Sequence, residues 1–122
     1  MTAFGFAIAA LGVALHAWIS FAKASEVAPF TVGLFFVGSV PYGVGALWLR
    51  YGGRPTIPVA GMLAALGVDF LVYHSVFIAP SSSTAALGLV VAPFWNLFVV
   101  MPVACLVAWG ILALCDRTSR AH

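Results

Sequence analysis

Residues 57–79 read IPVAGMLAALGVDFLVYHSVFIA, and this stretch decides the fold class. The run is apolar apart from Asp69, His74 and two hydroxyl side chains, and an α-helix needs about 20 such residues to cross a bilayer. A strand of a membrane barrel would instead alternate polar and apolar residues over about ten positions. The stretch therefore predicts a transmembrane helix that carries one carboxyl group near its middle.

Three further apolar runs cover residues 3–22, 30–49 and 85–115. Short segments with proline, glycine, serine or charged residues separate the runs, and the last run is long enough to tilt or to protrude from a bilayer. The hydroxyl side chains of residues 81–84 are suited to capping the start of the fourth helix. We therefore expect an all-α, polytopic integral membrane protein, in which residues 1–122 form one transmembrane domain, an antiparallel bundle of four transmembrane helices.

The composition excludes most soluble classes of protein. Hydrophobic residues make up 64% of the chain and charged residues 7%, with a net charge of +2, whereas soluble domains carry about 25% charged residues. A soluble enzyme, a disordered chain and a nucleic-acid-binding protein are thereby excluded, and the lipid bilayer is the expected partner. The sequence contains no nucleophile–base pair and no metal-ligand cluster, so we expect neither enzymatic activity nor a bound metal. Cys105 and Cys115 lie about 15 Å apart along one helix and are expected to be free thiols.

The basic residues predict the orientation in the membrane, because cytoplasmic loops carry an excess of Lys and Arg. Four arginines lie in the second loop and after the fourth helix: Arg50, Arg54, Arg117 and Arg120. The first loop has only Lys23, and the third loop has no charge. Both termini are therefore expected in the cytoplasm. The stretch 79–89, followed by Pro93, is typical of small bacterial inner-membrane proteins, so the inner membrane is the expected location.

Two patterns concern the packing of the helices. A shift of 55 residues aligns the sequence AALGV at 9–13 with AALGV at 64–68, which predicts a parallel repeat of two helical hairpins or reflects a chance match of common residues. Small residues also recur four apart, as at Gly61 and Ala65, where helices can approach closely. The close partner can be in the same chain or in another, and because four short helices enclose little space, we expect a homo-oligomer or a subunit of a membrane complex.

Asp69 is the leading candidate for a functional residue, because burying a charge in a bilayer is costly. It lies about ten residues before the end of its helix, roughly 15 Å below the surface. Ala65 and Tyr73 lie one turn away on the same face. Two interpretations stay open: a carboxylate that handles a proton or a cation, and a carboxyl group that ties two helices together.

The same depth arithmetic places Tyr42 and Asn96 within a turn of Asp69. Pro41 and Pro93 are close to them in the sequence, and each proline leaves the carbonyl group four residues earlier without its helical donor. Such interrupted helices commonly line substrate or ion sites, although prolines also occur in membrane helices for packing alone. We therefore predict a polar level at mid-membrane.

His16 and Ser20 lie on one face of the first helix, on a stripe that is small at the inner end and polar towards Lys23. His16 can serve as a proton relay or as a structural histidine. His74 sits at nearly the same depth on another helix, so the two imidazoles together could hold a haem iron. The residues around His74 favour packing or lipid contact, and we expect no cofactor.

These observations favour a small protein for the transport or permeation of an ion or small solute. The predicted pathway uses the polar level, with access from the outer end of the first helix, and contains Asp69, Tyr42, Asn96, His16, Ser20 and Tyr73. The alternative is a non-catalytic accessory subunit of a larger membrane complex, in which the histidines would contact haem or a pigment.

Overall fold

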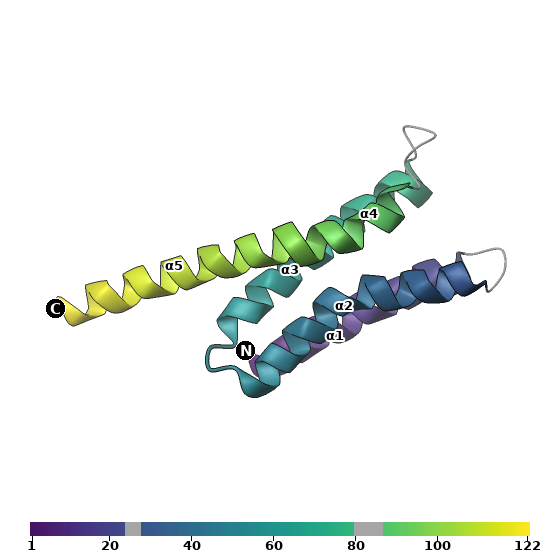
Figure 1. Ribbon diagram of the computed structural model, residues 1–122. Helices are drawn as coiled ribbons and strands as arrows, with labels where there is room; N and C mark the ends of the chain where they lie inside the picture. The colour runs from purple at the N-terminus through teal and green to yellow at the C-terminus, as the bar shows by residue number, and fades with distance from the viewer. Residues whose placement is uncertain (24–27, 80–86) are drawn as a thin grey trace.

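The computed structural model describes residues 1–23, 28–79 and 87–122, and these are helical almost throughout (Figure 1). The first helix is α1 and the π-helical turn η1, the second is α2, the third is α3 and η2, and the fourth is α4, η3 and α5. Their bounds are α1 Thr2–Ala17, η1 Trp18–Ala22, α2 Pro29–Tyr51, α3 Thr56–Tyr73, η2 His74–Ile78, α4 Leu87–Trp95, η3 Asn96–Val100 and α5 Met101–Arg120.

Four continuous helices in the described part of the chain are long and apolar enough to cross a membrane: Thr2–Ala22, Pro29–Tyr51, Thr56–Ile78 and Leu87–Arg120. They confirm the all-α class and the four predicted apolar helices. The predicted cap formed by residues 81–84 lies outside the described residues. Cys105 is buried and Cys115 exposed, and both are free, as predicted.

The ends of two helices follow from their polar residues. Pro29 occupies the first helical position of α2, and the Thr31 hydroxyl accepts a hydrogen bond from the Ala28 amide (2.9 Å) and donates one to the Ala28 carbonyl (2.7 Å). The fourth helix continues to Arg120 and does not end near residue 115 as predicted. Within this polar segment, Thr118 and Ser119 donate their hydroxyl hydrogens to carbonyls one turn earlier, so their side chains are satisfied inside the helix.

The helices form two antiparallel hairpins, which lie side by side in Figure 1. In the first hairpin, Gly5 of α1 lies against Leu49 of α2, and in the second, the Cys105 thiol of α5 contacts the Ile57 carbonyl of α3 (3.5 Å). The helix α3 packs against α1, α2, α4 and α5 and therefore joins the hairpins. An ion pair of Arg54 with Asp116 (2.9 Å) places the second loop beside the C-terminal helix.

The apolar core occupies one half of the bundle. Its contiguous cluster extends from the level of Asp69 to the end that carries the chain termini: Ile8, Ala9, Tyr42, Leu49, Ile57, Val59, Met62, Ala65, Leu66, Met101 and Cys105. In the other half, Ile19 and Ala92 are also buried. Large apolar side chains also cover the outside of the helices, among them Phe36, Phe98 and Leu106, which are about two thirds exposed. Lipid would remove such a surface from water.

Burial does not follow the 55-residue repeat. Ala10 and Leu11 are exposed, whereas their aligned partners Ala65 and Leu66 are buried in the core. A shared fold of the two hairpins would place aligned residues on equivalent faces, because one residue of slip turns a helical position by about 100°. The match of AALGV therefore does not carry over to the packing of α1 and α3.

Candidate functional site

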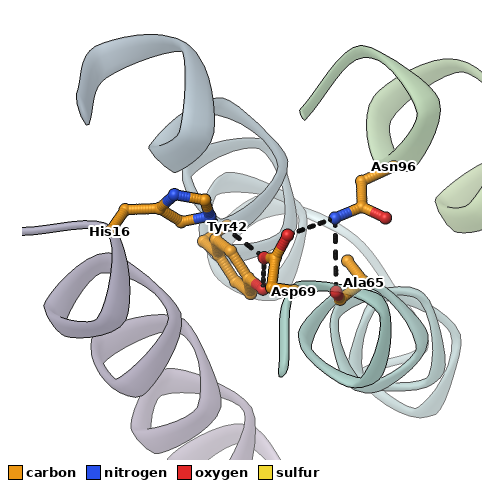
Figure 2. A network of polar contacts seen from close by, with 5 residues as sticks. All are labelled: His16, Tyr42, Ala65, Asp69 and Asn96. Atoms are coloured by element: carbon orange, nitrogen blue, oxygen red, sulfur yellow. Dashed lines mark hydrogen bonds and ion pairs between the residues drawn. The ribbon is translucent and has the colours of Figure 1, made fainter. Parts of the chain in front are cut away.

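The Asp69 carboxylate lies at the point where the four helices meet (Figure 2). Its Oδ2 accepts a hydrogen bond from the Tyr42 hydroxyl and lies 3.0 Å from His16 Nε2, and its Oδ1 accepts a hydrogen bond from Asn96 Nδ2 (2.7 Å). Asn96 Nδ2 also donates to the Ala65 carbonyl (3.2 Å). The Asp69 cluster, defined as His16, Tyr42, Asp69 and Asn96, thus takes one side chain from each helix.

All members of the Asp69 cluster are shielded from the surface of the bundle. Tyr42 is 0% exposed, Asn96 1%, Asp69 3% and His16 6%. A buried carboxylate is tolerated where hydrogen-bond donors surround it, because each donor replaces a bond that water would make. The Tyr42 hydroxyl and Asn96 Nδ2 supply that replacement, and His16 Nε2 lies at hydrogen-bonding distance; the three groups come from three different helices.

Two glycines make room for the cluster between α1 and α2. A Cβ atom on Gly12 of α1 would overlap the Tyr42 ring, and a Cβ atom on Gly38 of α2 would overlap the His16 ring. Gly12 lies four residues before His16 on α1, and Gly38 lies four residues before Tyr42 on α2. Because the two helices are antiparallel, the ring of each helix packs against the glycine of the other. The His16 and Tyr42 rings lie 6.0 Å apart, centre to centre, at a tilt of 50°.

Tyr42 and Asn96, predicted to lie within a turn of Asp69 in depth, both donate hydrogen bonds to its carboxylate. Neither proline ends its helix, since α2 continues through Pro41 and α4 through Pro93. The π-helical turn η3 begins at Asn96 itself, and π-helical turns often occur at functional sites. Use of this level as a pathway stays a prediction.

The pairing of His16 with Asp69 was not predicted from the sequence. Depth arithmetic placed His16 level with His74, closer to the outer surface than Asp69, and left the carboxylate without a cationic partner. That arithmetic assumes that all helices end in one plane. In the structure, His16 lies level with Asp69, so the first and third helices do not end in one plane. The spacing of Gly12 to His16 and of Gly38 to Tyr42 was the available signal, because it marks a reciprocal contact between the two helices.

The other predicted site residues lie around the cluster. Ser20 is 1% exposed, one turn from His16, and its hydroxyl has no hydrogen-bond partner among the described residues. Tyr73 is half-buried and is not part of the cluster, because its hydroxyl accepts a hydrogen bond from Trp18 Nε1 (3.3 Å). His74 is exposed. His16 is buried against Asp69, so the two histidines do not form a joint haem site in this structure.

A small cavity of about 10 Å³ adjoins the cluster, large enough for about one water molecule. His16 and Asp69 provide its polar wall. Its apolar wall consists of Ile19, Leu34, Val72, Leu89, Ala92 and Pro93. All six lie beyond the cluster towards the helix ends at Lys23 and Ala79, on the side away from the core.

The geometry suits the binding of a proton more than that of a metal. A histidine and an aspartate in contact can share a proton, and the charge of the pair changes by one when a proton is gained or lost. Within the described residues, no three His, Cys, Asp or Glu side chains lie close enough to hold a metal ion together.

Comparison with known proteins gives no match. No family model matches the sequence, and no curated protein and no solved structure match it either. The assignment of a function therefore rests on the chemistry of the Asp69 cluster and on the four apolar helices that enclose it.

Proposed function

We propose that the protein is an integral membrane protein that moves an ion or a small solute by way of the Asp69 cluster. The observation that carries the proposal is the contact of Asp69 Oδ2 with His16 Nε2, at 3.0 Å, where the four apolar helices meet. Ionisable groups at membrane depth are costly and usually mark ion pathways or proton relays. We propose no enzymatic role.

The charge distribution supports an orientation with both termini in the cytoplasm. The ion pair of Arg54 with Asp116 holds the second loop beside the end of the fourth helix, so the four arginines gather at one end of the bundle. Lys23 lies at the opposite end, near the Trp18 and Phe77 rings (5.9 and 5.7 Å). We propose the bacterial inner membrane as the location.

Flux measurements in proteoliposomes test the proposal. Asp69→Asn keeps the shape of the side chain and its hydrogen-bonding capacity but removes the charge and the proton-accepting carboxylate. Proton or cation flux should be lost in Asp69→Asn and retained in Asp116→Asn, because Asp116 is half exposed in its ion pair with Arg54. Unchanged flux in a folded Asp69→Asn protein contradicts transport through this site.

An accessory subunit of a membrane complex is the second candidate function. The fourth helix supports it, because an 18-residue window of this helix is 11% buried within the chain, compared with 44% for the third helix. Its free surface is available to lipid, to a second copy of the chain or to another subunit. Native mass spectrometry of protein extracted from its natural membrane should show bound subunits if this candidate is correct, and a monomer that supports flux excludes it.

A further inference from the structure

The hydrogen-bond donors around Asp69 indicate which species the cluster takes. The atoms that face the carboxylate are the Tyr42 hydroxyl, Asn96 Nδ2 and His16 Nε2, and each can donate a hydrogen bond to it. A metal cation needs the opposite arrangement, with several oxygen acceptors directed at one point. The side-chain oxygen of Asn96 is directed away from Asp69 (Figure 2). The cluster is therefore suited to a proton.

No other charged side chain contacts the His16–Asp69 pair among the described residues, so the charge of the site depends on the protons bound by this pair. Among the described residues, the ion pairs are His16 with Asp69 and Arg54 with Asp116, so no lysine or arginine neutralises Asp69. The titratable groups that face the Asp69 carboxylate are His16 from α1 and Tyr42 from α2, while the fourth helix contributes the neutral Asn96.

Access to the pair differs between the two ends of the bundle. Towards Lys23 and Ala79 lies the water-sized cavity, and three of its wall residues, Leu34, Val72 and Leu89, are only half-buried. The buried Ser20 hydroxyl, without a partner among the described residues, lies on the same side of His16. Towards the termini lies the apolar core. The described residues with buried polar side chains are His16, Ser20, Asp69 and Asn96, and none of them lies on the core side of the Asp69 cluster.

We infer that the His16–Asp69 pair takes up and releases a single proton, exchanged with water from the end of the bundle that carries Lys23 and Ala79. With His16 neutral and Asp69 ionised, the pair has a charge of −1. A hydronium ion in the cavity transfers one proton to the pair, which becomes neutral overall, and one water molecule remains. This inference rests on the proposed function, because it names the ion and the side from which it enters.

Spectroscopic titration tests the identity of the ion without a flux measurement. Infrared spectra report the protonation of Asp69, and nitrogen chemical shifts report that of His16, in protein reconstituted into lipid nanodiscs. We expect both signals to change with pH, and neither to change when choline is replaced by Na⁺ or Ca²⁺ at constant pH. A shift with Na⁺ or Ca²⁺, or the absence of any response to pH while the protein stays folded, overturns the inference.

Matched variants assign these signals. Asp69→Asn should remove the carboxyl signal that Asp116→Asn retains, and His74→Gln should leave the pH-dependent histidine signal in place. If Asp69→Asn does not fold, His16→Gln should abolish the histidine signal instead. If flux is the same with and without Asp69 while the His16–Asp69 pair still titrates, transport through the site is contradicted and the proton site is not. Failure of the proposed function and failure of this inference are therefore distinguishable.

The side of access is tested by thiol reactivity towards Ag⁺, which is small enough to follow water. Ala92 lines the cavity beside Asp69, and Cys105 lies in the core; both are 7% exposed. Cys105 also borders an apolar groove with Trp48, Ile57, Leu106 and Trp109, and the lining of this groove includes no residue of the Asp69 cluster. In the Cys115→Ser background, Ala92→Cys should react at least tenfold faster than Cys105, and only when Ag⁺ is added on the side of Lys23. Equal rates, or reaction from the opposite side, overturn the inference. Val72→Cys replaces Ala92→Cys if that variant does not fold.

Discussion

Tyr42 is the residue whose contribution to the Asp69 cluster can be isolated most cleanly. Tyr42→Phe removes a single oxygen atom from a fully buried side chain and leaves the carboxylate with one donor fewer. We expect a loss of about 1 kcal/mol in the free energy of unfolding, since hydrogen bonds within membranes contribute about 0.6 and up to about 1.7 kcal/mol. The infrared signal of Asp69 should shift as well. Thermal unfolding in detergent measures the first effect.

Tyr73→Phe is the control for Tyr42→Phe. It also removes one phenolic oxygen, from a half-buried ring that accepts a 3.3 Å hydrogen bond from Trp18. The Asp69 signal should not respond to it. Equal effects of the two substitutions on that signal would show that the Tyr42 hydroxyl does not act on the carboxylate.

Three of the four cluster residues could be predicted from the sequence, because each is a polar side chain near the middle of an apolar run. Asp69, Tyr42 and Asn96 met this criterion by residue counting alone. His16 was recognised as polar but placed at the wrong depth, since counting gives no information on how far one helix is displaced along another. Its pairing with Asp69 depends on the contact of α1 with α3, which joins residues 53 positions apart.

At the scale of the element, Gly38 determines how closely α1 approaches α2. Gly38→Ala places a methyl group where the His16 ring lies, and overpacking of this kind costs about 1–3 kcal/mol. We expect lower thermal stability and a changed nitrogen signal of His16, because the ring has to move relative to Asp69. Both quantities are measured on the same purified protein.

Gly43→Ala is the matched control on the same helix. Gly43 has no atom within 4 Å of the position of an added Cβ, and alanine favours a helix over glycine by about 1 kcal/mol. Gly43→Ala should therefore leave stability unchanged or raise it. A loss of stability of the same size at both positions would contradict the proposed close contact at Gly38.

The helices themselves were predictable to different degrees. Apolar run length predicted the spans, because about 20 residues are needed to cross a bilayer and few other structures have this requirement. The fourth helix was predicted too short, since hydropathy falls after Cys115 while the helical backbone continues through Thr118 and Ser119. Hydropathy indicates where contact with lipid ends, but a helix can continue beyond that point into a polar segment.

At the scale of the whole molecule, the two halves of the bundle differ in a way that the sequence does not reveal. All four apolar runs look alike along their length, yet the buried apolar core lies between the Asp69 cluster and the termini. This asymmetry depends on which faces of the four helices pack against one another. The same asymmetry appears in the match of AALGV, since similar residues on α1 and α3 differ in burial.

The orientation of the whole molecule gives the last prediction. Cys115 is exposed beside Asp116, which pairs with Arg54, so this native thiol marks the end of the bundle that carries the arginines. Ala79 is exposed at the opposite end of the third helix. In bacterial cells, a membrane-impermeant maleimide should label Ala79→Cys in the Cys115→Ser background without permeabilisation.

The native protein should be labelled at Cys115 only after the inner membrane is permeabilised, and the buried Cys105 provides the unlabelled reference. The reason is the excess of arginines at the end of Cys115, which favours retention of that end in the cytoplasm. Labelling of Cys115 in intact cells would show that the orientation is opposite to the one proposed. The entry side of the proton would reverse with it, because the cavity beside Asp69 lies towards Ala79 and the apolar core towards Cys115.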